Sequence, residues 1–319
     1  MKADFTKLHG NFGALVTSRL SPTDLLDSYV SEQLVEAWEQ HGGLLVIRDL
    51  TDLTPEQLAA ISENFGKLER SLDVSKRKFQ VEGLPIQRLG NCKDEAGELV
   101  SIFAREKEIS EAQSITFDPD TRYPVWHTDS TYRSPPPRGS LFFCKQAPPR
   151  GAATCFADTS AAFEALPKDK QAELESLDAI CSMAHHDAKV HMRAPTYPRL
   201  TEEQRLANPP TRVPLVLKHP CTGRRALYGF NSSTFAVLPQ GESLDTATND
   251  ECERTGVEHT SADVLRQLLP HCTTPEFTIR WQWREGDLLV WDNFSTIHCA
   301  TGFDDAQFTR EMWRTTVLL

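Results

Sequence analysis

The sequence of 319 residues predicts a mostly β fold with flanking helices, either a β-sandwich or a jelly roll. The first observation is a period of two from about residue 85 onward, in short apolar runs separated by Gly and Pro. The second is that helical spacing interrupts these runs in only two stretches, Ser160–Ile180 and Ser261–Leu269. The third is an N-terminal part that reads as helix, strand and helix.

In that N-terminal part, Ser31–Gln40 has helical spacing and is followed by the helix-ending pair Gly42-Gly43. Leu44–Ile47 is a short apolar run that predicts a buried strand. Thr54-Pro55-Glu56-Gln57 has the form of a capping box with Pro at the first helical position, and it predicts a helix up to Gly66.

The later part predicts a core of strands and two polar, irregular segments, residues 182–213 and 238–259, which are either lids or surface insertions. We expect one domain over residues 1–319, with about 1–84 packed on the core. The predicted core strands are Pro85–Leu89, Ser140–Lys145, Thr154–Ala157, Ala226–Phe230, Thr278–Trp283, Asp287–Trp291 and Thr309–Leu318.

Charge and cysteine content exclude several classes of partner. The 34 basic and 45 acidic residues give a net charge of −11, and no basic run could follow a nucleic-acid backbone. No segment has the roughly 20 apolar residues that span a membrane, and the first residues lack the apolar stretch of a secretory signal. The eight cysteines form no Cys-x-x-Cys pair, which favours reduced thiols and a cytoplasmic location.

A metal site is indicated by His127, Asp129 and His298. On an extended strand, residues two apart point to the same side, so His127 and Asp129 would converge. Two imidazoles and one carboxylate can hold one face of a ferrous ion and leave other positions open for oxygen chemistry. His185-His186-Asp187 has the same His-x-Asp spacing, but no strand is evident around it, so we expect a solvated or lid histidine there.

Two arginines follow on the last predicted strand. Arg310, Met312 and Arg314 share one face of Thr309–Leu318, and Trp313 lies on the other. A buried guanidinium needs an anionic partner. That partner is either a structural carboxylate or an acidic ligand, and the residues alone leave both open.

Taken together, these residues resemble the taurine dioxygenase (TauD/TfdA) family of Fe(II)- and 2-oxoglutarate-dependent oxygenases. The resemblance covers most of the chain, from about Ser31 to the end. The matching motifs are Trp126-His127-Thr128-Asp129, Pro148–Asp158, Trp291-Asp292-Asn293 with His298, and Arg310-x-x-x-Arg314.

The resemblance implies a double-stranded β-helix (jelly-roll, cupin-like) core and a homo-oligomer. It implies Fe(II) on His127, Asp129 and His298, with 2-oxoglutarate and O2 as co-substrates. Thr154 would donate a hydrogen bond to 2-oxoglutarate, and Arg310 would pair with its distal carboxylate. Arg314 matches the position that binds the acidic group of the prime substrate.

Two departures from the family pattern concern the substrate side. The chain has Gly151-Ala152-Ala153-Thr154 where relatives often have Gly-Gly-Asp-Thr, a change that keeps the hydroxyl. Tyr123, which we expect in the substrate pocket, replaces an asparagine of taurine-specific members and argues against taurine.

The expected reaction is hydroxylation of a small acidic molecule, with cleavage or desaturation as variants, coupled to decarboxylation of 2-oxoglutarate to succinate and CO2. The aspartate ligand argues against halogenation, because halogenating relatives replace it with a small residue. Two alternatives stay open: a jelly-roll metalloprotein of different chemistry, such as an isomerase or a 2-oxoglutarate-independent dioxygenase, and a non-catalytic binding protein.

Overall fold

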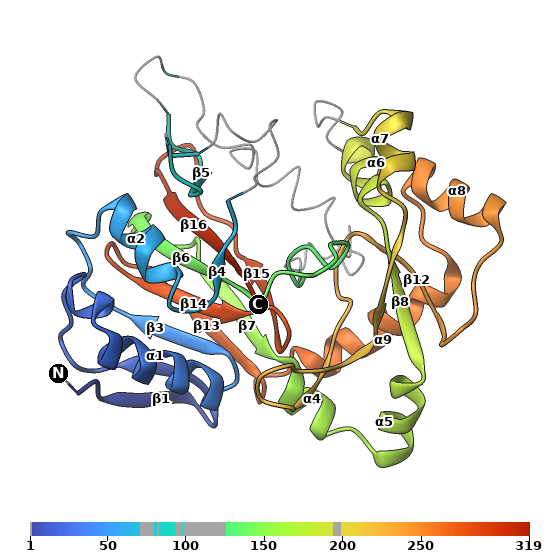
Figure 1. Cartoon of the computed structure of the whole chain (residues 1–319). Coiled ribbons are helices and arrows are strands. Elements are labelled where there is room, and N and C mark those ends of the chain that lie inside the picture. The colour runs from blue at the N-terminus through green and yellow to red at the C-terminus, as the bar shows by residue number, and fades with distance from the viewer. Residues whose placement is uncertain (1, 71–79, 82, 94–96, 98–125, 194–198) are drawn as a thin grey trace.

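The computed structural model describes residues 2–70, 80–81, 83–93, 97, 126–193 and 199–319 (Figure 1). Within these residues, the larger sheet has eight strands in the order β1-β2-β3-β14-β6-β16-β4, and β5 also pairs with β16. The strands span Phe5–His9 (β1), Phe12–Val16 (β2), Leu44–Ile47 (β3), Lys67–Leu68 (β4), Gln87–Gly90 (β5), Gly139–Gln146 (β6), Leu288–Asp292 (β14) and Glu311–Leu318 (β16). The N-terminal strands are therefore part of the main sheet.

A smaller antiparallel sheet is formed by β13, β7 and β15, in that order. Side chains from both sheets meet in one core cluster, which includes Phe142 and Trp291 of the larger sheet and Phe156 and Trp281 of the smaller one. The period of two in the sequence places these apolar side chains on the facing sides of the sheets. The predicted jelly-roll core is confirmed, with its smaller sheet at Thr154–Asp158 (β7), Thr278–Trp281 (β13) and Thr296–Ala300 (β15).

Two N-terminal helices cover the outer face of the larger sheet (Figure 1). Helix α1, Ser28–Gln40, begins before the predicted Ser31 because the Asp27 side chain caps it by accepting from the Val30 N–H at 3.1 Å. Helix α2, Pro55–Ser62, opens with the predicted capping box. Both helices are confirmed, although α2 ends at Ser62 rather than Gly66.

The predicted helix Ser160–Ile180 is wrong at its C-terminal end. Two short helices separated by Pro167 occupy its first part, Thr159–Glu164 (α4) and Lys168–Glu175 (α5). The remainder is a strand, Leu177–Cys181 (β8), which pairs on both sides with strands distant in sequence. These partners are Thr211–Pro214 (β9) and Thr234–Pro239 (β12). The predicted strand Ala226–Phe230 is present but shorter, as Arg225–Leu227 (β11), and it forms a hairpin with Val216–Lys218 (β10).

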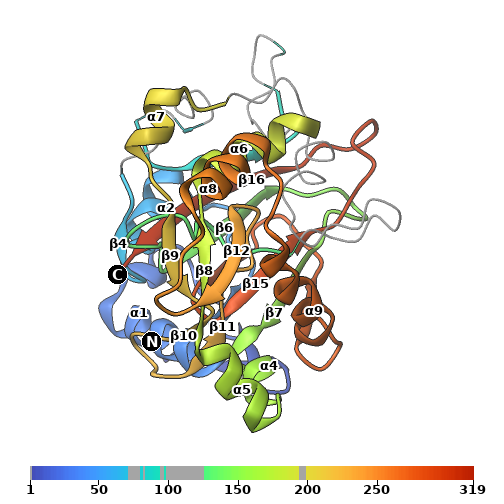
Figure 2. The ribbon, with the colours of Figure 1, turned by 90° about the vertical axis from the view of Figure 1, so that its right-hand side faces the viewer.

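Both segments predicted to be irregular contain helices, so that prediction is wrong. Helices α6 and α8 lie beside each other over β8 and β12 (Figure 2). The helices of this region are Met183–Arg193 (α6), Glu202–Ala207 (α7) and Thr246–Thr255 (α8), and the predicted helix near Ser261–Leu269 is confirmed as Asp263–Cys272 (α9). None of the helices in the described ranges is long and apolar enough to cross a membrane.

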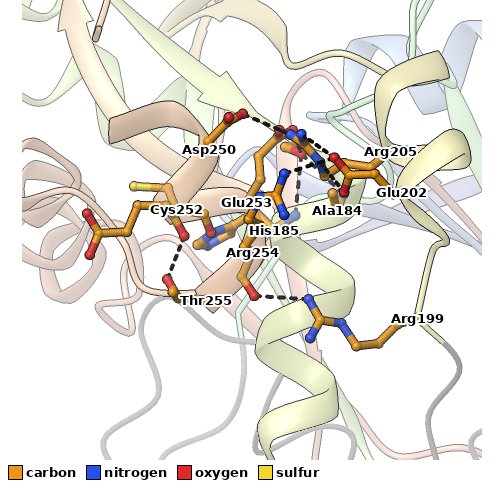
Figure 3. Close-up of polar contacts among 12 residues, drawn as sticks. Ala184, His185, Arg199, Glu202, Arg205, Asp250, Cys252, Glu253, Arg254 and Thr255 are labelled. Carbon is orange, nitrogen blue, oxygen red and sulfur yellow. Dashed lines mark hydrogen bonds and ion pairs between the residues drawn. The ribbon is translucent and has the colours of Figure 1, made fainter. Parts of the chain in front are cut away.

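A network of charges holds α7 against α8 (Figure 3). Arg205 forms ion pairs with Glu202, Asp250 and Glu253. Glu253 is 4% exposed and also accepts from Ser182 Oγ at 2.6 Å, so its buried charge is doubly satisfied. A cavity of about 240 Å3 lies beside this network. Its lining includes three members of this paired cluster, Glu202, Arg205 and Glu253.

Candidate metal centre

The jelly roll brings His127 and His298 together through the backbone. Each residue donates its N–H to the carbonyl of the other at 2.9 Å, as an isolated antiparallel bridge. The two imidazole rings lie 4.3 Å apart between centroids. His298 sits in the middle of β15, whereas His127 forms an isolated bridge beside it and Asp129 lies in the turn that follows. The predicted convergence of His127 and Asp129 is therefore observed.

One ligand atom from each of His127, Asp129 and His298 lies within 4.8 Å of the others. The Nε2 atoms of His127 and His298 are 3.7 Å and 4.0 Å from Asp129 Oδ1. Two nitrogen or oxygen ligands of one first-row metal ion lie at most about 4.2 Å apart, which is twice a bond of about 2.1 Å. These two spacings therefore fit a shared ion, with room for additional ligands.

The protonation states of the triad also suit a metal. Burial raises the pKa of the Asp129 carboxyl, but Arg314 and the two imidazoles outweigh it and bring that pKa down to about 2. Burial, together with His127, lowers the pKa of His298 to about 3. At neutral pH the carboxylate is ionised and the His298 ring is neutral, which is the form of each that binds metal.

The turn before His298 is held by a buried network that the sequence did not reveal. Asp292 Oδ1 accepts from the N–H groups of Phe294 and Ser295, and Asp292 Oδ2 lies 3.0 Å from His219 Nε2. Gly43 packs against this turn with φ +79, and a Cβ there would lie 2.5 Å from the Cβ of Asp292. The glycine that ends α1 in the sequence thus also allows the close approach that positions β15.

Thr154 and Arg310 each contact one ring of an aromatic pair, Trp283 and Phe142. Trp283 Nε1 donates to Thr154 Oγ1 at 2.9 Å, so the Thr154 hydroxyl proton can be donated to a ligand. The guanidinium carbon of Arg310 lies 5.7 Å from the ring centroid of Phe142, which packs edge-on against Trp283. The contact between Trp283 and Thr154 carries no signal in the sequence, and sequence reasoning did not single out Trp283.

The position of Arg310 is fixed by its backbone. Arg310 is 3% exposed, and its N–H donates to Asn91 Oδ1 at 2.8 Å. Gly90 has φ +134, and a Cβ there would come within 2.0 Å of the Arg310 carbonyl oxygen. The end of β5 therefore has to be a glycine for β16 to start at this place.

Arg314 lies closer to the metal ligands than the sequence suggested. Its Nη1 is 3.4 Å from both carboxylate oxygens of Asp129, and its Nε and Nη2 donate to Gln87 Oε1 at 3.1 Å and 2.7 Å. Ser140 Oγ also donates to Asp129, at 3.3 Å. Tyr123, the other predicted substrate residue, lies outside the described residues.

The second His-x-Asp motif is ruled out as a strand pair because it lies on helix α6. Residues two apart on a helix point to nearly opposite sides, so His185 and Asp187 diverge. His185 is fully buried rather than solvated, packs against Phe235, and its Nδ1 lies 2.8 Å from the carbonyl oxygen of Cys252 (Figure 3). The expectation of a solvated histidine is therefore wrong.

Burial of His185 predicts a pH-dependent stability. Burial lowers the pKa of His185 to about 4, whereas the unfolded chain binds this proton below about pH 6.5. The free energy of unfolding should therefore fall as pH falls from about 6.5 toward 4, by roughly 2 kcal/mol between pH 7 and pH 5. Urea unfolding of the wild type and of His185→Gln, whose amide can still donate to Cys252, would measure it. Equal pH dependence in both proteins would contradict the assignment.

Comparison with known proteins agrees with this geometry. The family model described as "Taurine catabolism dioxygenase TauD, TfdA family" matches residues 4–316. The "Alpha-ketoglutarate-dependent 2,4-dichlorophenoxyacetate dioxygenase" of Cupriavidus pinatubonensis is 30% identical over 310 residues, which cover 95% of each chain. The "(S)-phenoxypropionate/alpha-ketoglutarate-dioxygenase" of Sphingobium herbicidovorans is 29% identical over 316 residues, 98% of this chain and 94% of the relative.

The fold of the chain is also similar to that of a solved structure. A crystal structure of AAD-2 in complex with Mn(II) and N-oxalylglycine superposes with a TM-score of 0.69 at 24% identity, over 99% of this chain and 97% of that one. The residues that the family model matches, 4–316, include His127, Asp129 and His298. The chain therefore belongs to the TauD/TfdA family and is an Fe(II)- and 2-oxoglutarate-dependent dioxygenase that acts on a small organic molecule.

Proposed function

We propose that this dioxygenase hydroxylates a small organic acid, with iron held by His127, Asp129 and His298. The observation that carries the proposal is the cluster itself: three ligand atoms within 4.8 Å of one another, beside a guanidinium. When bound, iron with 2-oxoglutarate and O2 supplies the oxidation, in which 2-oxoglutarate yields succinate and CO2 while a substrate C–H bond becomes C–OH.

Arg310 and Thr154 are the residues that would hold 2-oxoglutarate. A planar guanidinium pairs with a carboxylate through two parallel hydrogen bonds. The Arg310 guanidinium lies 5.7 Å from the ring centroid of Phe142, and Trp283 Nε1 donates to Thr154 Oγ1 at 2.9 Å. Arg310 would pair with one carboxylate of 2-oxoglutarate and Thr154 would donate a hydrogen bond to it, and the buried rings of Phe142 and Trp283 would shield these contacts from water.

Arg314 is the residue that would bind the acidic group of the prime substrate. Within the described part of the chain, Asp129 is its one carboxylate partner, at 3.4 Å. Once Asp129 is bound to iron, its negative charge is shared with the metal and compensates Arg314 less. The side chain of Arg314 is 22% exposed, so a substrate anion can reach it and restore the balance of charge.

The aryloxy acids are the substrate class with the best support. The two relatives described above are named for 2,4-dichlorophenoxyacetate and (S)-phenoxypropionate, each of which has one carboxylate on a short chain attached to an aromatic ether. Hydroxylation at the carbon between the ether oxygen and the carboxylate would give a hemiacetal, which collapses to a phenol and an oxo acid. In this chain the carboxylate would be held by Arg314.

A succinate-release assay with Fe(II), 2-oxoglutarate and a panel of organic acids tests the proposal. We expect succinate formation stimulated by at least one aryloxy acid, with a phenol as the second product. Mass measurement of the products separates hydroxylation, a gain of one oxygen, from desaturation, a loss of two hydrogens, and from cleavage. Succinate release that no acid stimulates would contradict an acidic prime substrate.

We also propose that the chain forms one domain and a homo-oligomer in the cytoplasm. The hydrogen bonding of β1–β3 into the main sheet supports a single domain. All eight cysteines are free thiols, which suits a reducing compartment. The oligomeric state rests on the family resemblance, and light scattering of the purified protein would measure it.

A further inference from the structure

The side edge of the Arg314 guanidinium, formed by Nε and Nη2, is bound by the neutral side chain of Gln87. Gln87 and Arg314 face each other in register on β5 and β16. A guanidinium only donates hydrogen bonds, so the amide atom that faces it must be the oxygen. Gln87 Oε1 accepts from both Nε and Nη2, at 3.1 Å and 2.7 Å. Gln87 is itself 8% exposed, so the pair is formed away from bulk water.

The remaining donors of Arg314 match an anion. A guanidinium has five N–H groups. Gln87 accepts from two of them, on Nε and Nη2, and both carboxylate oxygens of Asp129 lie 3.4 Å from Nη1. Among the described residues, the second N–H of Nη2 has no acceptor. A carboxylate of a bound ligand can accept from it in a charge-assisted hydrogen bond.

The same two strands carry a second arginine with a different partner. Arg88, next to Gln87 on β5, forms an ion pair with Glu311 on β16, with Nη2 2.7 Å and Nε 2.8 Å from Glu311 Oε1. The positive charge of Arg88 is therefore neutralised by a carboxylate. At Arg314, an amide oxygen makes the equivalent two contacts and adds no charge.

We propose that Gln87 is the positioning residue that sets the enzyme's preference for an anionic prime substrate. It fixes the guanidinium of Arg314 beside Asp129, and it adds no negative charge that would compete with the substrate. This inference rests on the proposed function of Arg314 and adds the residue that makes that function possible. A carboxylate at position 87 would hold the arginine equally well but would neutralise it.

The test is Gln87→Glu, which changes the charge with little change of shape. Binding is measured by calorimetry on the full chain loaded with Mn(II) and N-oxalylglycine, which keeps both carboxylates of 2-oxoglutarate and prevents turnover. The two probes are 2,4-dichlorophenoxyacetate and its uncharged amide. We expect the wild type to prefer the acid, and the ratio of acid to amide affinity to fall roughly 10- to 100-fold in Gln87→Glu. Affinity for the amide and for N-oxalylglycine should change little.

Glu311→Gln is the matched control, because it makes the reverse exchange on the neighbouring arginine and should keep the wild-type ratio. Gln87→Met, which removes the acceptor without adding charge, should weaken acid binding and provides a second variant if Gln87→Glu folds poorly. An unchanged ratio of acid to amide affinity in Gln87→Glu, or an equal fall of that ratio in Glu311→Gln, overturns the role of Gln87. Either result leaves the proposed substrate class standing. A wild type that shows no preference for the acid overturns both the proposed substrate class and this inference.

Discussion

Replacing His298 with alanine is expected to abolish iron binding and succinate formation together. The substitution leaves His127 and Asp129 as a two-ligand site, and it removes a ring whose Nε2 lies 4.0 Å from Asp129 Oδ1. Losing a residue that merely orients a metal ligand costs about 10- to 100-fold in affinity. Losing a ligand should therefore cost more than about 100-fold. Iron content after dialysis, measured beside activity, gives the result.

His185→Gln is the control for this experiment, because His185 belongs to the other His-x-Asp motif and is equally buried. It should retain iron and activity. Unchanged iron affinity in His298→Ala, with the fold preserved by circular dichroism, would remove His298 from the site.

Replacing Arg310 with alanine should chiefly weaken the binding of 2-oxoglutarate. Arg310 is 3% exposed, so the carboxylate that it holds would be taken from water and left without a counter-charge in the variant. Truncating one member of a desolvated charge pair costs about 2–5 kcal/mol, which would appear as a rise in the KM for 2-oxoglutarate. Steady-state kinetics with each co-substrate varied in turn measures this effect.

Arg314→Ala is the matched comparison, four residues along the same chain. It should weaken binding of the prime substrate by about 2–5 kcal/mol, which would appear as a rise in the KM for that substrate. The KM for 2-oxoglutarate should change little. Equal effects of either variant on both KM values would show that the two arginines do not divide the acids between them.

Local signals in the sequence predicted the central part of the fold correctly. The capping box at Thr54 and the apolar run Leu44–Ile47 depend on neighbouring residues, and both appear as expected. Leu177–Cys181 was read as helix because its signal is not local: the strand exists through its pairing with β9 and β12. Helix α6 was missed because it buries small and polar residues, such as Ala184, His185 and Ala188, rather than a stripe of large apolar ones.

Residues of the candidate site that belong to a sequence motif could be predicted. Residues that reach the site only through a contact with a side chain distant in sequence could not. The motif around His127 and Asp129, together with His298 and the family resemblance, predicted three side chains that the structure does bring together. Gln87 and Trp283 carry no motif, and each hydrogen-bonds a side chain more than 100 residues away in sequence. Finding them requires the register of β5 on β16 and the packing of the two sheets against each other.

The central claim is that His127, Asp129 and His298 bind one ferrous ion that also takes 2-oxoglutarate. Anaerobic titration of the purified protein with Fe(II) and then 2-oxoglutarate, followed by visible absorption, tests it most directly. We expect a charge-transfer band that needs both additions and is lost in His298→Ala. Absence of the band in the wild type at saturating Fe(II) and 2-oxoglutarate, or its persistence in the variant, would contradict the account.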